Sequence, residues 1–206
     1  MEFNNLYLIV KKYGFKARIT TISVESIEYI RSNPIPEKYF SDRLKIEQND
    51  EEIETPPEKI TSDLDRLYEI FNESLENFGS LFVKFEEKSG KDMSNWIANL
   101  QYTSFDELLL CIKYSDLLSD YLDDMIVDTS TINIVFKKWY PLNPSMELRC
   151  FIFNGKLKGI CQRNISVCYD FYPDLISMKI ISRISKIVDL LNQDIEQLNC
   201  KLKRLS

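Results

Sequence analysis

Residues 139–163 read WYPLNPSMELRCFIFNGKLKGICQR, and this stretch carries the clearest structural signal in the sequence. It contains Asn154-Gly155, the strongest short signal for a β-hairpin, because both central positions of a type I′ turn need positive φ. A turn at this pair predicts that Phe153 opposes Lys156, and each step outward pairs the next two residues. The resulting pairs farther from the turn are Phe151 with Lys158, Arg149 with Ile160 and Glu147 with Gln162.

The two faces of this predicted hairpin differ in chemistry, because strand side chains alternate between faces. One face is wholly apolar, and we expect it to be core: Leu148, Cys150, Ile152, Leu157, Gly159 and Cys161. The other face gathers polar groups beside Phe151 and Ile160: Glu147, Arg149 and Gln162, with Arg163 just past the pairing. Such groups cost stability unless they are paired or meet a ligand. The spacing leaves open an internal Glu147–Arg149 ion pair or a ligand site.

A second basic element precedes the hairpin. The β-rich run INIVFKKW at 132–139 ends in Lys137 and Lys138, which are followed by Trp139 and Tyr140. Between residues 130 and 163 there are six basic residues and one acidic residue, a local charge that favours phosphate. No GxxxxGK[ST] or GxGxxG motif is present, so side chains would have to hold a polyphosphate. Lys84 in LFVKF is a candidate third cation, or else a lysine on the solvent face of an edge strand.

Composition excludes several classes of function. The chain has 206 residues, a net charge of -6 and no histidine, which argues against a general nucleic-acid binder and removes His-based catalysis. No apolar run is long enough to span a membrane, and the start lacks a signal peptide, so we expect a cytoplasmic protein. Its five cysteines show no CxxC spacing, so we expect reduced thiols and no metal site.

Helical signals surround these strands. Ser62–Phe78 reads as a helix with a capping box at Ser62 and Asp65 and with Gly79 at its C-terminal end. Ser104 and Glu107 open a second helix through Tyr114, and a third is expected from Asp116 to about Ile126. The last ~25 residues form an apolar stripe typical of a helix that packs on its own domain, or alternatively of a coiled-coil dimer.

At this point the residues resemble the cell division cycle protein 123 family, whose members assist assembly of eukaryotic translation initiation factor 2 (eIF2). The resemblance is carried by four segments: FKKWYPLNPSMELRCFIFNGKLKGICQRN (136–164), FGSLFVKFEEKSGKDMSNWI (78–97), SFDELLLCIKYSDLLSDYL (104–122) and YGFKARITTISV (13–24). It implies an α+β, ATP-grasp-like fold with two lobes around a nucleotide cleft. We expect one such domain over 1–206, made of an N-terminal segment (1–44), an acidic linker (45–60), the lysine-bearing strand with helices (61–130), and the hinge strand, hairpin and last helix (131–206).

The resemblance also implies roles for the candidate residues. Lys84 would reach the α-phosphate and adenine of ATP, and the backbone of the hinge strand, Lys137, Lys138, Trp139 and Tyr140, would meet the adenine edge. Arg149 and Arg163 would take the phosphates, with Glu147 and Gln162 contacting the ribose or orienting the arginines. Glu86 and Glu87 replace the family's Asn-Trp after Lys84, where two carboxylates would repel a polyphosphate.

The family continues past its last helix into strands that bind Mg²⁺, and this chain ends before them. We therefore expect a C-terminally incomplete fold without the usual metal ligands and without transfer chemistry.

The leading hypothesis is a monomeric, non-enzymatic assembly factor that binds ATP and the gamma subunit of eIF2. The alternatives are a degenerate interaction module that has lost nucleotide binding, and an ATP-dependent ligase using the same cleft.

Overall fold

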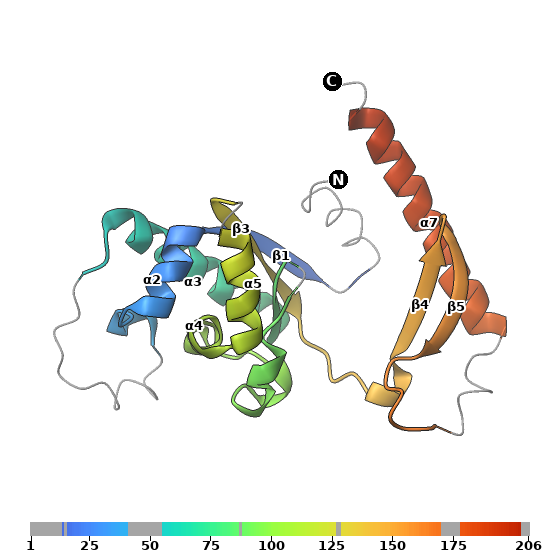
Figure 1. The fold of residues 1–206 in the computed structure, drawn as a ribbon, viewed down its shortest axis with the longest axis horizontal. Helices are drawn as coiled ribbons and strands as arrows, with labels where there is room; N and C mark the ends of the chain where they lie inside the picture. The colour runs from blue at the N-terminus through green and yellow to red at the C-terminus, as the bar shows by residue number, and fades with distance from the viewer. Residues whose placement is uncertain are drawn as a thin grey trace. The chain divides into compact units, whose positions relative to one another are not determined.

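The protein is described here by a computed structural model of the chain, which covers residues 14, 16–40, 55–86, 88–126, 129–169 and 178–202 (Figure 1). It divides into two compact units. Phe15–Trp139 form one unit, and residues from Tyr140 onward belong to the other. The boundary between them lies within the expected segment 131–206. Most of the expected acidic linker, and Glu87, lie outside the described residues.

The unit before Tyr140 is built on a three-stranded antiparallel sheet. Its strands are β1 (Ala17–Ser23), β2 (Leu81–Phe85) and β3 (Thr131–Lys138), and their order is β1-β3-β2. The central strand β3 pairs Ile134 with Thr20 of β1 and with Phe85 of β2. Both β1 and β2 are therefore edges of this sheet, and Lys84 lies on an edge strand.

Helices enclose the core on one side of this sheet. They are α2 (Val24–Ser32), α3 (Glu58–Phe78), α4 (Phe105–Tyr114) and α5 (Asp116–Ile126), with short 3₁₀ turns η1 (Glu37–Tyr39), η3 (Lys91–Asn95) and η4 (Ala98–Leu100). Helix α3 buries Leu64, Leu67 and Phe71, and the Phe71 ring meets Phe136 of β3 edge-to-face at 5.5 Å between centroids. The core cluster lies entirely within this unit.

Several helix boundaries confirm the sequence signals. Ser104 and Glu107 form a capping box at α4, and α5 spans Asp116–Ile126 as expected. Gly79 follows α3 with φ 81°, a conformation that favours glycine.

The expected capping box at Ser62 and Asp65 is wrong, because α3 begins four residues earlier. Pro57 is its N-cap, and the Thr61 amide donates to the Pro57 carbonyl at 2.9 Å. The helix begins directly after the proline pair at 56–57, so Ser62 lies inside the helix and not at its start.

The unit from Tyr140 onward contains a hairpin and a long helix. After the 3₁₀ turn η5 (Pro144–Met146) come β4 (Leu148–Phe153), β5 (Lys156–Gln162) and α7 (Met178–Leu202). The turn is as expected, with φ of 48° at Asn154 and 69° at Gly155. Helix α7 lies along β5, and its Asn192 amide donates to the Gly155 carbonyl (Figure 1).

The hairpin's apolar face is not core, contrary to expectation. None of the residues from Leu148 to Gln162 is buried, and Ile152 is 50% exposed. Within the described part of this unit, Val188 of α7 is the one buried apolar residue. Within the described part of this unit one helix accompanies the hairpin, and two strands with one helix bury little apolar surface.

Candidate functional site

Two of the candidate lysines lie on one face of the three-stranded sheet. Lys84 pairs with Val135 and Lys137 pairs with Phe82, so these four residues share the face opposite Phe136 and Ile134. We call this the lysine face. Lys84 and Lys137 are diagonal neighbours on it, a relation that places Cα atoms about 7–8 Å apart. The sheet therefore brings together two cations that are 53 positions apart in the numbering of the chain.

The positive charge of Lys137, on the lysine face, costs free energy in the folded chain. Its side chain is half-buried, and burial lowers its pKa below the usual value. Among the described residues, no carboxylate forms an ion pair with it. Desolvation without a counter-charge disfavours the ammonium form. An anion arriving at this face would remove that cost.

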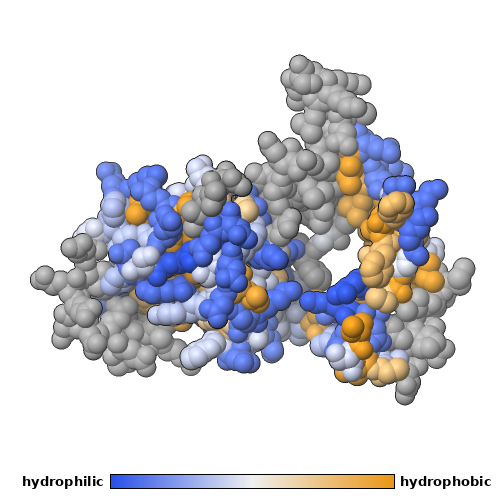
Figure 2. Space-filling view, viewed as in Figure 1, coloured by the Kyte–Doolittle hydropathy of each residue, from blue (hydrophilic) through white to orange (hydrophobic). Residues whose placement is uncertain are grey.

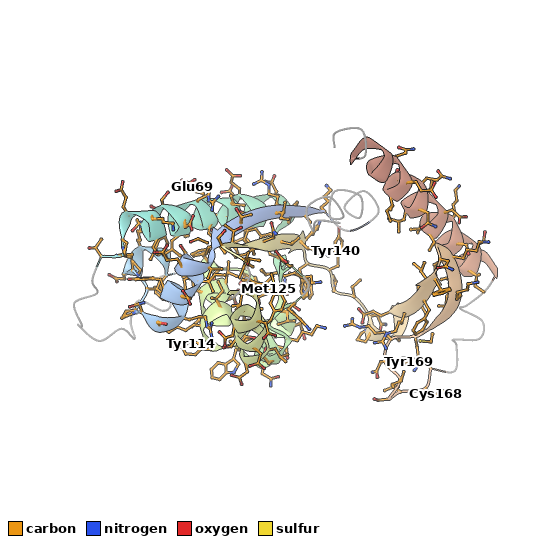
Figure 3. The ribbon with its side chains drawn as sticks, turned by 45° about the horizontal axis from the view of Figure 1, so that its top comes forward. Glu69, Tyr114, Met125, Tyr140, Cys168 and Tyr169 are labelled. Carbon is orange, nitrogen blue, oxygen red and sulfur yellow. The ribbon has the colours of Figure 1, made fainter. Side chains whose placement is uncertain are left out.

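The other hinge residues lie at the end of β3. The Lys138 amide donates to the Lys16 carbonyl at 2.8 Å, and the Trp139 amide donates to the Ser80 carbonyl at 3.0 Å. The Trp139 ring nitrogen also donates, to the Asn99 carbonyl at 3.2 Å. These donors are used within the unit, so an adenine edge would have to use other backbone groups of the segment. Tyr140 follows in the segment that leaves β3 (Figure 3).

The hairpin differs from its expected register because β5 contains a bulge. Phe153 still pairs with Lys156, but Phe151 pairs with Gly159 and Arg149 with Cys161. The extra residue, Lys158, shifts every pair beyond it by one position, and a shift of one moves side chains to the opposite face. The expected pairing of Arg149 with Ile160 is therefore wrong.

The bulge also separates the expected polar cluster. Arg149 now shares a face with Phe151 and Cys161, whereas Gln162 lies on the other face with Leu148. Arg149 is exposed, and within the described residues its guanidinium forms no ion pair. The hairpin thus presents one unneutralised guanidinium beside an exposed phenylalanine.

Glu147 pairs with Arg163 and not with Arg149. The Arg163 Nη1 donates to both carboxylate oxygens, at 2.6 and 2.8 Å, and the Arg163 amide donates to the Glu147 carbonyl at 2.9 Å. The open alternative of a Glu147–Arg149 pair is therefore wrong. Gln162 donates its amide to the carbonyls of Asn164 and Val167, which closes the loop after β5.

Within each unit, then, the candidates fall into separate groups. Lys84 and Lys137 meet on the lysine face, Glu147 and Arg163 form a pair, and Arg149 and Gln162 occupy opposite hairpin faces.

The sequence reading missed Asn133 and the role of Glu86. Glu86 has φ 49°, and its Oε1 accepts from the Asn133 side-chain amide at 2.7 Å and from the Asn133 backbone at 3.3 Å. These bonds hold the Glu86 carboxylate in place, but the neutral amide leaves its negative charge intact. The Asn133 Oδ1 atom is buried without a partner in the described structure. Its signal was a single polar residue within the apolar run INIVF.

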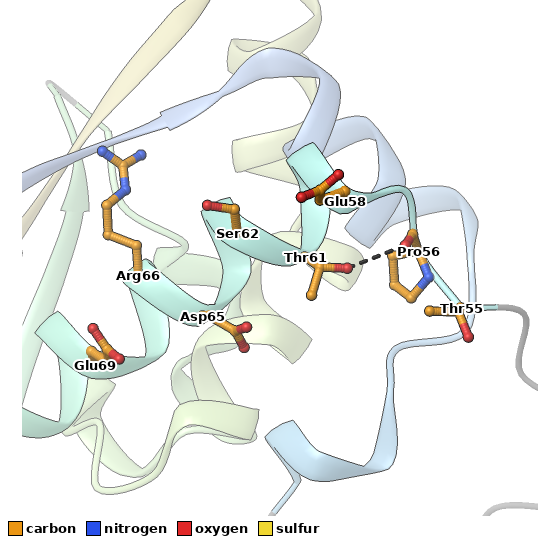
Figure 4. Close-up of a pocket in the computed structure, with 8 residues that line it drawn as sticks. All are labelled: Thr55, Pro56, Glu58, Thr61, Ser62, Asp65, Arg66 and Glu69. Atoms are coloured by element: carbon orange, nitrogen blue, oxygen red, sulfur yellow. Dashed lines mark hydrogen bonds between the residues drawn. The ribbon is translucent and has the colours of Figure 1, made fainter.

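A hollow of about 760 Å³ opens along α3, and none of these candidates lines it (Figure 4). It is lined by Thr55, Pro56, Glu58, Thr61, Ser62, Asp65, Arg66 and Glu69. Its polar groups are engaged in local structure: Asp65 accepts from Lys38 and from the Tyr39 hydroxyl, each at 2.7 Å. Burial, and then that carboxylate, raises the pKa of Tyr39 to about 12. This network ties η1 to α3.

The described residues contain no group of three or more Cys, Asp or Glu side chains that could hold a metal ion. No described helix is both long and apolar enough to cross a bilayer. Cys111, Cys150, Cys161 and Cys168 are free thiols, and burial raises the pKa of Cys111.

Comparison with known proteins assigns the family. The model of the D123 family matches residues 7–200, so the chain belongs to this family. Curated relatives carry the name translation initiation factor eIF2 assembly protein. The one from Schizosaccharomyces pombe is 24% identical over 208 residues, covering 91% of this chain and 64% of that protein. The one from Dictyostelium discoideum is 35% identical over 105 residues, covering 47% and 27%.

Solved structures agree with the fold. The structure of Cdc123 from Schizosaccharomyces pombe aligns with a TM-score of 0.59 at 22% identity, covering 92% of this chain and 73% of that one. Its C-terminally truncated form gives 0.62 at 23% identity. The chain spans about a quarter to two thirds of the length of the two curated relatives above.

Proposed function

We propose that this chain assists the assembly of eIF2 as an ATP-binding factor that contacts the gamma subunit in the cytoplasm. The family and the names of the relatives support the eIF2 part of this proposal. The nucleotide part is supported by one observation above all: Lys137 is half-buried on the same face as Lys84 and has no described carboxylate partner.

The residues fit the chemistry of a polyphosphate. Lys84 and Lys137 offer ammonium groups from one sheet face, and Arg149 offers a planar guanidinium that can bind two phosphate oxygens at once. Bound ATP would supply the negative charge that Lys137 lacks among the described residues. We propose that the chain binds nucleotide without transferring a phosphoryl group.

A degenerate interaction module is the second candidate, and the hairpin loop favours it. Arg163 is neutralised by Glu147, and Gln162 is satisfied by backbone carbonyls, so two expected ligand contacts are already occupied. Such a module would still bind the partner protein but would no longer bind the nucleotide.

Calorimetric titration of ATP, with and without Mg²⁺, separates the two candidates. We expect the intact chain to bind ATP and Arg149→Ala to bind at least tenfold more weakly, because a charge-assisted hydrogen bond contributes about 1.5–3 kcal/mol. Lys156→Ala is the matched control, since Lys156 is an exposed cation at the turn end of the same hairpin face. Heat signals that are absent for the intact chain would exclude the ATP-binding factor and favour the degenerate module.

A further inference from the structure

Three large hydrophobic side chains of the unit before Tyr140 are exposed, one just after η3 and two at the junction of α4 and α5. Trp96 is 84% exposed, Tyr114 is 60% exposed and Leu117 is 52% exposed. Trp96 is the most exposed large hydrophobic side chain among the described residues, and Tyr114 is labelled in Figure 3. We call these three residues the aromatic patch. Exposed groups of this kind often mark interaction sites.

The patch is held together by Asp92 of η3. Its Oδ1 accepts from the Ser115 hydroxyl at 2.7 Å, and its Oδ2 accepts from the Leu117 amide at 3.3 Å. These bonds fasten η3 to the junction between α4 and α5, where Tyr114 and Leu117 lie. Trp96 comes four residues after Asp92, within about 8 Å along a 3₁₀ turn. Asp92 therefore links the turn that ends just before Trp96 to the helix junction that carries Tyr114 and Leu117.

Trp96 is exposed although its backbone is anchored. Its amide donates to the Met93 carbonyl at 2.9 Å, and the Ile97 amide donates to the same carbonyl at 2.8 Å. Met93 and Ile97 on either side are buried, at 6% and 1% exposure. A segment fixed on both sides presents the indole outward as a stable feature. An indole held in this way is a suitable anchor for a partner.

The rim of the patch is acidic. Helix α5 carries four aspartates and no basic residue. Asp123 pairs with Arg31 at 2.7 Å, whereas the other three are exposed and form no ion pair within the described structure: Asp116, Asp120 and Asp124. Asp120 and Asp124 follow Leu117 by three and seven positions, so they share its side of the helix.

We propose that the aromatic patch and these three aspartates form a docking surface for a basic segment of a protein partner. Trp and Tyr are the side chains most enriched at binding hot spots, and an arginine stacks favourably on an indole. The aspartates would attract a basic partner and repel a nucleic acid. Taking eIF2 as the partner rests on the proposed function, and the surface then marks where eIF2 meets the chain.

The test measures the affinity of the intact chain for purified eIF2 by surface plasmon resonance at two salt concentrations. We expect Trp96→Ala to weaken binding at least tenfold. The double variant Asp116→Lys/Asp120→Lys should weaken binding similarly and reduce its salt dependence. Ile165→Ala is the control for the loss of an exposed apolar group, and Glu69→Lys/Glu76→Lys is the control for the same change in net charge. Circular dichroism would check that each variant folds.

The outcomes separate the two proposals. Binding by the intact chain that is unchanged in both patch variants would overturn the docking surface and leave the proposed function standing. No binding by the intact chain would overturn both. Sedimentation of the chain alone completes the test: self-association lost in Trp96→Ala would make a second copy the occupant and overturn the assignment to a partner.

Discussion

At the scale of single residues, the charge of Lys137 has opposite effects on folding and on the proposed binding. It disfavours the folded chain and would favour an anionic ligand. Burial lowers the pKa of this lysine in the folded chain, so its charge opposes folding wherever the ammonium form persists. Glu147 and Arg163 show the opposite arrangement, because each neutralises the other. Unneutralised cations such as Lys137 and Arg149 are therefore the more informative side chains for ligand binding.

We expect Lys137→Met to stabilise the chain at pH 7 by about 0.5–1 kcal/mol, at the low end of the range for single substitutions. The same change should weaken ATP binding about tenfold, because the cation that meets phosphate is lost. Chemical unfolding and calorimetric titration give the two values. Stability and affinity would then move in opposite directions.

The pH dependence follows from the lowered pKa. The folded chain releases the Lys137 proton before the unfolded chain does, so the cost is fully present below the folded pKa and disappears as pH rises toward the ordinary lysine value. The stability gain of Lys137→Met should therefore shrink as pH rises toward the ordinary lysine pKa of about 10.4. Lys91→Met, at an exposed lysine, is the control. A gain independent of pH would contradict the electrostatic cause.

At the scale of elements, the segment that contains Trp96 packs closely against helix α4. Gly90 lies just before η3, and a Cβ placed on it would come within 2.4 Å of Cys111 Sγ and 3.1 Å of Ser115 Oγ. Tyr102 donates its hydroxyl to the same Cys111 sulfur at 3.1 Å. Because glycine has no Cβ, Gly90 allows η3 to approach α4 and α5 closely.

Gly90→Ala should lower the free energy of unfolding by about 1–3 kcal/mol, the usual cost of overpacking. Urea titrations followed by circular dichroism would measure it. The double variant Gly90→Ala/Cys111→Ala should recover part of the loss relative to Cys111→Ala alone, because the clashing sulfur is gone. Strict additivity of the two changes would mean that the contact with Cys111 is not the cause.

At the scale of the whole molecule, burial is divided unequally between the two units. The core cluster lies in Phe15–Trp139, whereas none of the residues Leu148–Gln162 in the hairpin is buried. Segments with few buried apolar contacts open at low free energy. The unit that carries Arg149 should therefore be the less protected one.

Hydrogen–deuterium exchange on the intact chain would test this difference. We expect amides of β3 to exchange roughly a hundredfold more slowly than amides of β4 and β5, because β3 is paired on both sides within the core. Addition of ATP should slow exchange in the hairpin if Arg149 holds phosphate. Equal protection in β3 and the hairpin would contradict the unequal burial.

Most local elements, and the family, can be predicted from residues that lie close together in the sequence. The hairpin turn at 154–155, the cap at Gly79, the capping box of α4 and the bounds of α5 all follow from interactions between residues a few positions apart. The residue pattern at 136–164 also sufficed for the family assignment, which the comparison confirms. Such signals are short-range, so they can be read along the chain.

The arrangement of the candidate residues depends on contacts between segments that are distant in the sequence. The bulge at Lys158 places Arg149 and Gln162 on opposite faces of the hairpin. Arg163, which follows β5, forms an ion pair with Glu147. The sheet order placed Lys84 beside Lys137, and η3 brought Asp92 to Leu117. These relations depend on which distant segments pack together and on where water is excluded. Residue spacing along the chain contains neither, which is why the face of each charged side chain had to come from the structure.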